Sequence, residues 1–357
     1  MPIGMSHSGL RYRPRGMGLA WRASKWLRIP VAAGALTLAA TAAGCGGNDS
    51  DPNANQTPTL ARVANFPQPS GRSFRALIGN MLQGPALAQS TPVIVPGRNR
   101  FGFALFDRGN RQIGDLEVSV YVARGLDEPV RGPYPARFEP ITVKPPFISQ
   151  TTAQDSNAAQ SVYVSQVSFP RAGSYLVSAV ARLNRKLVAT SPAQLMVAPD
   201  DALPGPGDKA ISVHTPTVAS VHGNVKSIDT RVPPDDMHSV DLVDALKRKR
   251  PVVLLFATPA LCQSRVCGPV TDVTEQVKSE YGDRADFIHM EIYKDNNPNK
   301  GVRPQIPAWG LCSQRGKSVV CNEPFLFTIN RRGRVAAQLQ GAFSVTELED
   351  AVRKALR

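Results

Sequence analysis

Two cysteines in one loop are the residues of this chain best placed to do chemistry. Cys262 and Cys267 follow an apolar run, residues 252–257, which has no polar face and therefore predicts a short buried strand. After them, residues 270–277 have helical spacing and predict a helix with acidic residues in its first turn. A thiolate at a helix N-terminus has a lowered pKa, and a second thiol can release a mixed disulfide. The stretch therefore predicts a redox-active dithiol between a strand and a helix.

The spacing of the two cysteines limits where they can lie. Five helical steps of about 100° would place the side chains about 140° apart, which a disulfide does not bridge well. Both cysteines are therefore expected in the loop, with Gly268 as the helix N-cap and Pro269 near the first helical position. The sequence leaves open which cysteine attacks, although Cys267 is slightly better placed for the helix dipole. Arg265 would add positive charge between them.

The N-terminal region predicts export and lipidation. Six basic residues precede an apolar, small-residue run at 29–44, which is typical of a signal peptide (1–44) and shorter than the roughly 20 residues that span a bilayer. The sequence Ala-Ala-Gly-Cys45 resembles a bacterial lipobox, with Ala at its first position, and this implies cleavage before Cys45 and diacylglyceryl attachment to its thiol. We expect a cell-membrane location on the extracytoplasmic side, where cysteines form disulfides. A cleaved signal with an incidental cysteine is the alternative, and Met17 is a second possible start.

The middle of the chain predicts an all-β domain. Polar residues after Cys45 indicate a flexible, lipidated tether over 45–90, and a proline- and glycine-rich linker at 199–208 marks a boundary. Between them, short strands in 91–198 favour an immunoglobulin-like β-sandwich whose partner stays unknown. The predicted strands are residues 100–106, 116–122, 163–169, 174–181 and 186–189.

The formal net charge of +14 does not predict nucleic-acid binding. The basic residues are scattered, and their short runs, such as residues 247–250, are not interleaved with aromatic residues. The positive charge fits solubility and attraction to an anionic cell envelope.

The C-terminal region, residues 209–357, alternates between helical and strand patterns. The last helix should begin at Ser344 as N-cap, with Glu347 completing a capping box. The preceding strands should form a hairpin because Gly333 lies in a short turn between them. The predicted elements are a helix at 240–247, a strand at 252–257, a helix ending near 282, strands at 286–292, 325–330 and 334–340, and a helix at 345–356.

This order of elements resembles the thioredoxin superfamily, in particular its extracytoplasmic members. Pro324, just before a strand, matches the cis-proline of that family, which lies against the cysteine pair and shapes substrate docking. The resemblance implies an α/β domain with a central mixed sheet and thiol-disulfide oxidoreductase activity on protein thiols and disulfides of the envelope, without a cofactor. Two features depart from the family: Leu261 replaces the usual Trp, and the motif is Cys-x4-Cys. Alternatively, Cys267-Gly-Pro-Val270 matches Cys-Gly-Pro-Cys with its second cysteine lost.

The remaining cysteines and one histidine leave other functions open. Cys312 and Cys321 bracket a predicted hairpin, and a structural disulfide there would contribute about 2–3 kcal/mol, although a second redox pair is the alternative. His289 is expected to be a hydrogen-bonded core histidine rather than a metal ligand acting together with the cysteines. The rival functions are a redox-silent interaction module, a copper chaperone using His289, and a peroxiredoxin-like variant, since Thr258 to Cys262 partly matches that family's motif.

Overall fold

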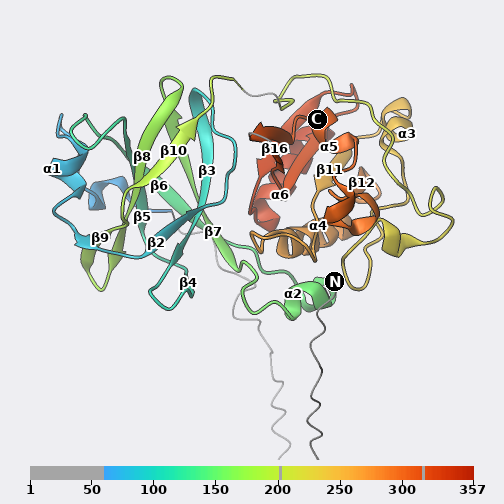
Figure 1. Cartoon of the computed structure of the whole chain (residues 1–357), viewed down its shortest axis with the longest axis horizontal. Coiled ribbons are helices and arrows are strands. Elements are labelled where there is room, and N and C mark those ends of the chain that lie inside the picture. Colours follow the sequence, from blue (N-terminus) through green and yellow to red (C-terminus); the bar gives the residue numbers. More distant parts are fainter. Residues whose placement is uncertain (1–59, 201–202, 316–317) are drawn as a thin grey trace, which may run out of the picture. The chain divides into compact units, whose positions relative to one another are not determined.

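The computed structural model of the chain describes residues 60–200, 203–315 and 318–357 (Figure 1). The predicted signal peptide, Cys45 and residues 45–59 of the predicted tether lie outside these ranges. Within the described ranges, no helix has the length and apolar character that crossing a membrane requires.

The first part of the described chain forms one ten-stranded sheet with the order β1-β9-β8-β5-β6-β7-β3-β2, in which β10 also pairs with β8 and β4 with β3. The sheet is mixed because β1 runs parallel to β9, whereas the other pairs are antiparallel. The strands are β1 (Leu82–Gln83), β2 (Ala86–Gln89), β3 (Gly97–Phe106), β4 (Gln112–Ile113), β5 (Val118–Ala123), β6 (Arg131–Pro140), β7 (Ser161–Phe169), β8 (Gly173–Leu183), β9 (Lys186–Ala189) and β10 (Ala193–Val197).

This pairing differs from the predicted immunoglobulin-like sandwich, which would have two separate sheets. Strand β6 hydrogen-bonds to both β5 and β7 and so joins what would have been two layers. The sequence pattern hid β6 because it contains Pro133 and Pro135, and proline argues against a central strand. The all-β character was predicted, but the immunoglobulin-like arrangement is not confirmed.

The β region also begins earlier than residue 91. Residues 60–90, predicted as part of a tether, include a 3-10 helix η1 (Val63–Asn65), a helix α1 (Phe74–Ile78) and strands β1 and β2. Phe66, Phe74 and Leu77 are buried against Tyr121 of β5. These apolar side chains explain why the segment packs on the sheet.

The C-terminal part contains a four-stranded sheet with the order β12-β11-β15-β16. Strand β11 is parallel to β12 and antiparallel to β15, which is antiparallel to β16. This strand order is the one expected of a thioredoxin-like domain. The elements are α3 (Leu242–Lys247), β11 (Val252–Phe256), α4 (Cys267–Tyr281), β12 (Asp286–Met290), η4 (Lys294–Asn296), η5 (Pro298–Lys300), α5 (Gln305–Ala308), β13 (Cys312–Arg315), β14 (Ser318–Cys321), β15 (Phe325–Ile329), β16 (Val335–Gln340) and α6 (Val345–Leu356).

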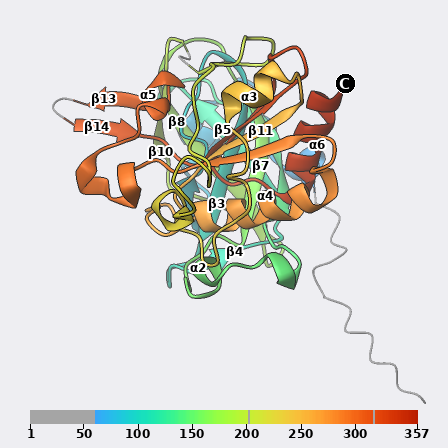
Figure 2. The ribbon, with the colours of Figure 1, turned by 90° about the vertical axis from the view of Figure 1, so that its right-hand side faces the viewer.

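Strand β11 is buried along its whole length, as its uninterrupted apolar run predicts. Successive side chains point to opposite faces of a strand, and they enter two different cores. Val253 and Leu255 pack in the core that also holds α4 and α6 residues. Leu254 and Phe256 pack in the core that includes Trp309 and residues of α3 and α5. The sheet is therefore covered by helices on both faces (Figure 2).

The last helix begins where the sequence predicts, but its capping differs in one bond. Ser344 is the N-cap, and its side chain accepts a hydrogen bond from the Glu347 backbone N–H. The Glu347 carboxylate does not complete the predicted capping box, because it forms a buried ion pair with Arg100 at 2.7 Å. This bond ties α6 to β3.

Two segments without regular strands contact α4. Residues 203–241 contain no strand or α-helix and have one 3-10 helix, η3 (Val225–Ser227). Between β6 and β7 lie η2 (Pro145–Phe147) and the short helix α2 (Gln150–Ala153), which lies beside α4 in Figures 1 and 2.

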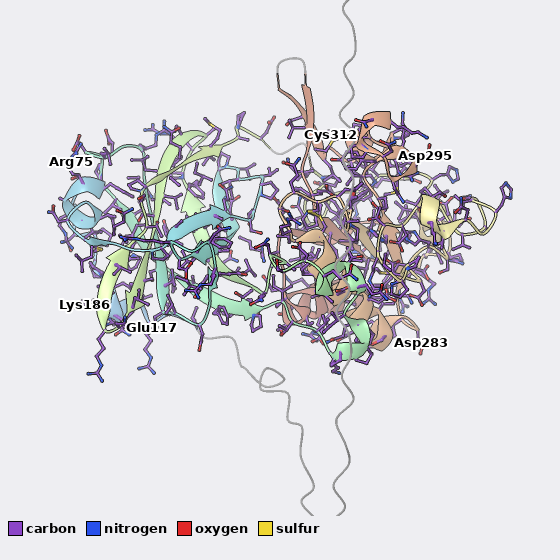
Figure 3. The ribbon with its side chains drawn as sticks, turned by 60° about the horizontal axis from the view of Figure 1, so that its bottom comes forward. Arg75, Glu117, Lys186, Asp283, Asp295 and Cys312 are labelled. Carbon is purple, nitrogen blue, oxygen red and sulfur yellow. A yellow bond between two sulfur atoms is a disulfide. The ribbon has the colours of Figure 1, made fainter. Side chains whose placement is uncertain are left out.

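Cys312 and Cys321 form the predicted hairpin disulfide. The two residues are directly opposite each other in the β13–β14 ladder, with Cα atoms 4.0 Å apart, and Figure 3 labels Cys312 at the base of the hairpin. The bond closes a short loop, because the two cysteines are nine positions apart in the sequence.

Replacing Cys312 and Cys321 together with serine should lower the free energy of unfolding by about 2–3 kcal/mol, since the bond restricts only a short loop of the unfolded chain. Urea denaturation would measure the change. Disulfide exchange activity should persist in this variant; its loss would favour the second redox pair instead.

Candidate redox-active site

The loop between β11 and α4 brings Cys262 and Cys267 together. The Thr258 carbonyl accepts hydrogen bonds from the Leu261 and Cys262 N–H groups, which turns the chain after the strand. Arg265 then has a φ of +58°, and this left-handed residue directs the chain into the helix. The two cysteines form a disulfide with Cα atoms 5.9 Å apart.

The helix begins earlier than its sequence predicts. Cys267 is its first residue and Val266 is the N-cap, so Gly268 does not cap the helix and Cys267 does not lie in the loop. The first turn carries no acidic residue. The disulfide is compatible with the wide spacing because Cys262 lies in the preceding turn, where its backbone is free of helical geometry.

The two sulfur-bearing residues differ in exposure. Cys267 is 0% exposed at the helix N-terminus, whereas Cys262 is 8% exposed and its Sγ lies 3.1 Å from the Ser264 hydroxyl. A reacting partner would therefore reach Cys262 first. The helix dipole and the partial positive charge of the N-terminal amides act most directly on Cys267.

A cavity of about 550 Å³ opens beside Cys262. One wall comes from the cysteine loop and α4, including Arg265 and Gly268, and the other comes from residues 150–158 around α2. An ion pair of 3.2 Å between Arg265 and Asp155 joins the two walls. The β6–β7 connection thus supplies part of the surface that a ligand of this cavity would contact.

A buried ion pair, Arg231 with Asp272, connects the segments that line the cavity. Arg231 Nε lies 2.9 Å from Asp272 Oδ1, and the two side chains are 6% and 1% exposed. The guanidinium also donates to the Phe147 carbonyl, while the other Asp272 oxygen accepts from the Ser149 N–H and hydroxyl. These bonds hold the irregular segment, the β6–β7 connection and α4 together.

Glu323 lies next to Cys267, and its side chain is partly buried. Its Oε2 is 3.6 Å from Cys267 Sγ. Burial raises the pKa of Glu323 to about 8, even though hydrogen bonds from Thr258 favour the ionised form. Near neutral pH the carboxyl is protonated, and because a disulfide sulfur has no hydrogen, Glu323 is the donor toward Cys267.

The residue after Glu323 is the predicted cis-proline. The Glu323–Pro324 peptide is cis, as the resemblance implies, and Pro324 immediately precedes β15. Pro324 is thus next in sequence to the carboxyl that faces Cys267.

His289 lies apart from the cysteines. It is fully buried, with Nδ1 2.7 Å from Asp235 Oδ2 and Nε2 3.1 Å from the Ala257 carbonyl. Burial alone would lower the pKa of His289, but the Asp235 carboxylate raises it to about 10. Among the described residues, those close enough to share an ion with Cys262 and Cys267 include Glu323 but not His289. The prediction of a hydrogen-bonded core histidine agrees with these contacts, and a copper site shared by His289 and the cysteines does not.

Sequence reasoning did not identify several of these residues as functional. Glu323 directly precedes Pro324, and the other residues lie in the irregular segment 203–241. Within that segment Asp229, Asp235 and His238 are all buried. Their signal is a run of acids and a histidine within ten positions of an otherwise irregular stretch.

Comparisons with known proteins give one distant structural likeness. No protein-family model matches the chain, and a search of curated proteins finds no match. A solved structure of a thiol:disulfide interchange protein, described as a thioredoxin family protein, from Chlorobium tepidum TLS is 20% identical and covers 44% of this chain and 100% of its own, with a TM-score of 0.28. A score this low does not establish the fold, so the thioredoxin-like description rests on the strand order and helix placement above.

Proposed function

We propose that the chain is a thiol-disulfide oxidoreductase that uses Cys262 and Cys267. One observation carries the proposal: the disulfide has an outer sulfur beside a cavity and an inner sulfur at a helix N-terminus, next to a partly buried carboxyl whose pKa is raised. Thiol exchange depends on access to one sulfur and on stabilisation of the other as a leaving thiolate, and a neighbouring acid can supply a proton to that thiolate.

The exchange begins with a substrate thiolate attacking Cys262 Sγ. A bond forms between the two sulfurs, the Cys262–Cys267 bond breaks, and Cys267 leaves as a thiolate that takes the proton of Glu323. The second thiol of the same substrate, as its thiolate, then attacks the substrate sulfur of the mixed disulfide. The substrate disulfide forms, and Cys262 is released as a thiolate. Two electrons pass from the substrate dithiol to the pair, and the reverse sequence reduces a substrate disulfide.

Glu323→Gln should slow the reduction of the Cys262–Cys267 disulfide by about 10²-fold near neutral pH, since general acid catalysis contributes at least this much. In the native chain, the rate per substrate thiolate should fall as pH rises through about 8, where Glu323 loses its proton. The variant should lack this decrease. Stopped-flow reduction by a small monothiol, normalised to thiolate concentration, would measure both effects.

The exposed Glu280→Gln variant is the matched control and should behave like the native chain. A stability measurement provides an independent check. Because the folded pKa of Glu323 lies above its unfolded value of about 4.3, its contribution to stability is complete below that value and is lost as pH rises through about 8. A native rate that stays level between pH 6 and 9 would remove Glu323 from the mechanism.

We propose that this activity is exerted at the extracytoplasmic face of the cell membrane, on protein thiols and disulfides of the envelope. The signal-like residues 29–44 and the lipobox-like sequence ending at Cys45 support this location. Mass spectrometry of the membrane fraction should find Cys45 as the modified N-terminal residue. An unmodified Cys45 would contradict the lipid anchor without affecting the redox proposal.

The reduction potential of the Cys262–Cys267 pair tests whether the disulfide does redox work. We expect a value near or above about −250 mV, whereas structural disulfides are typically below about −300 mV. Equilibration with glutathione buffers, followed by quantification of free thiols, would give the value. A potential in the structural range would favour a redox-silent interaction module.

A further inference from the structure

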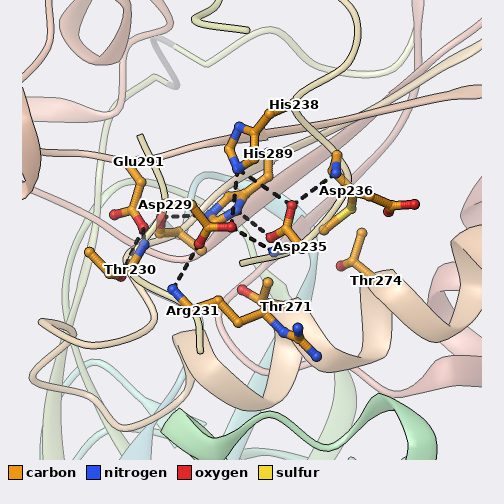
Figure 4. Close-up of polar contacts among 12 residues, drawn as sticks. Asp229, Thr230, Arg231, Asp235, Asp236, His238, Thr271, Thr274, His289 and Glu291 are labelled. Atoms are coloured by element: carbon orange, nitrogen blue, oxygen red, sulfur yellow. Dashed lines mark hydrogen bonds and ion pairs between the residues drawn. The ribbon is translucent and has the colours of Figure 1, made fainter. Parts of the chain in front are cut away.

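A second group of buried polar side chains lies between the irregular segment and the sheet. It comprises Asp229, Asp235 and His238 from residues 203–241 and His289 from β12 (Figure 4). One ligand-type atom from each residue lies within 4.8 Å of the others. All four side chains are at most 1% exposed. Such a concentration of buried carboxylates and imidazoles requires compensation of its charge and hydrogen-bonding capacity.

His238 is the member that its neighbours do not satisfy. Neither ring nitrogen has a hydrogen-bond partner, although the residue is 1% exposed. Its Nε2 is directed toward two carboxylates, at 3.4 Å from Asp229 Oδ2 and 3.4 Å from Asp235 Oδ1. A buried donor or acceptor left without a partner costs about 1–3 kcal/mol, so an additional binding partner between these three atoms would remove a penalty.

The two contacts of His238 fit a shared metal ion better than they fit hydrogen bonds, whereas His289 and Asp235 are at hydrogen-bond distance. Bonds of about 2.0–2.1 Å from a tetrahedral ion to nitrogen or oxygen place neighbouring ligand atoms about 3.3 Å apart. The two 3.4 Å contacts of His238 are close to this spacing. His289 contributes the second imidazole, and its Nε2 faces the Ala257 carbonyl. Metal-binding histidines commonly donate their other ring N–H to such a carbonyl.

We propose that Asp229, Asp235, His238 and His289 form a closed structural site for a divalent transition-metal ion, with Zn²⁺ as the expected occupant. Two imidazole nitrogens and two carboxylate oxygens suit Zn²⁺ or Co²⁺, and four protein ligands leave no open position for catalysis. On binding, the ion replaces the proton between His289 Nδ1 and Asp235 Oδ2, and this proton is released to solvent.

The site would fasten the irregular segment to the sheet. Three ligands lie within residues 229–238 and the fourth lies on β12, so one ion joins parts of the chain separated by about fifty positions. Because the ligands are buried, the ion would enter during folding or through local opening. This site is independent of the cysteine pair and of the proposed redox activity.

Cobalt binding during refolding tests the site. The full chain, with its disulfides intact and any free thiol alkylated, would be unfolded in guanidinium chloride and refolded with or without Co²⁺, then desalted. We expect one Co²⁺ retained per chain, with the visible absorption of a tetrahedral centre and no thiolate-to-cobalt band. Saturating Zn²⁺ should displace it and raise the melting temperature.

His238→Phe is the informative variant because it keeps an aromatic ring of similar size and removes no hydrogen bond of the described structure. Its metal affinity should fall by at least about ten-fold, as should that of Asp229→Asn. The exposed His222→Asn variant is the control and should bind as the native chain does. If refolded native chain retains no cobalt, or if both His238→Phe and Asp229→Asn retain as much as it does, the site does not exist. If the variants do not fold, retention by the native chain with the weak spectrum of octahedral Co²⁺ would also overturn the proposal, and retention with the intense tetrahedral spectrum would uphold it.

Discussion

Serine at position 262 is expected to abolish disulfide exchange, because Cys262 is the sulfur that a partner can reach beside the cavity. The loss should be on the order of 10³-fold or more, as for removal of a catalytic nucleophile. Reduction of a protein disulfide by the pre-reduced chain, followed by thiol release, would measure it.

Cys267→Ser should behave differently from Cys262→Ser. It should still attack a substrate disulfide through Cys262 but should be unable to release it, so a mixed disulfide should accumulate. Non-reducing electrophoresis and mass spectrometry would identify this adduct. Trapping through Cys267 in the Cys262→Ser variant would instead reverse the two roles, and full activity in both variants would end the oxidoreductase proposal.

Arg231→Leu is expected to lower the free energy of unfolding by about 3–5 kcal/mol, because it leaves the Asp272 carboxylate buried without its charge partner. The same change removes the bond to the Phe147 carbonyl that positions the β6–β7 connection. Urea denaturation with both disulfides intact would measure the stability. A double variant, Arg231→Leu with Asp272→Leu, should recover part of the loss because it leaves no unpaired charge.

Arg75→Ala is the control for charge removal in general. Arg75 pairs with Asp127 at 2.8 Å, but the two side chains are 60% and 77% exposed, and Figure 3 labels Arg75 at the surface of α1. We expect a change much smaller than that of Arg231→Leu, because solvent and salt screen an exposed ion pair. Equal effects of Arg75→Ala and Arg231→Leu would contradict the role assigned to burial.

The sequence was sufficient for the C-terminal fold because its signals are local. The apolar run of β11, the cap at Ser344 and the turn at Gly333 each determine a short element, and the order of those elements leaves few arrangements. The pairing of Cys312 with Cys321 was accessible for the same reason, since a hairpin places them opposite each other.

The features that the sequence did not predict depend on contacts between residues distant in the chain. The local sequence pattern does not indicate the burial that raises the pKa of Glu323. It also does not indicate that residues 229–238 lie next to β12. Strand β6 was missed because its prolines obscure the strand pattern, and without β6 the β region divides into two sheets. The helix start at Cys267 was also missed, because Gly268 and Pro269 resemble a cap followed by a first turn.

Residues 150–158 form one wall of the cavity, although they lie far in sequence from the cysteine pair. Two properties, the reduction potential of the disulfide and the selection of a substrate, would therefore depend on different parts of the chain. In the proposed exchange, α4 and Glu323 would influence the reduction potential of the disulfide, whereas a connection that belongs to the β region would contact the substrate protein. Replacing this connection with another of similar length should therefore change which substrate proteins exchange disulfides with the chain. The reduction potential of the Cys262–Cys267 disulfide should stay nearly constant. The β region would determine substrate selectivity, and the C-terminal part would determine the reactivity of the cysteine pair.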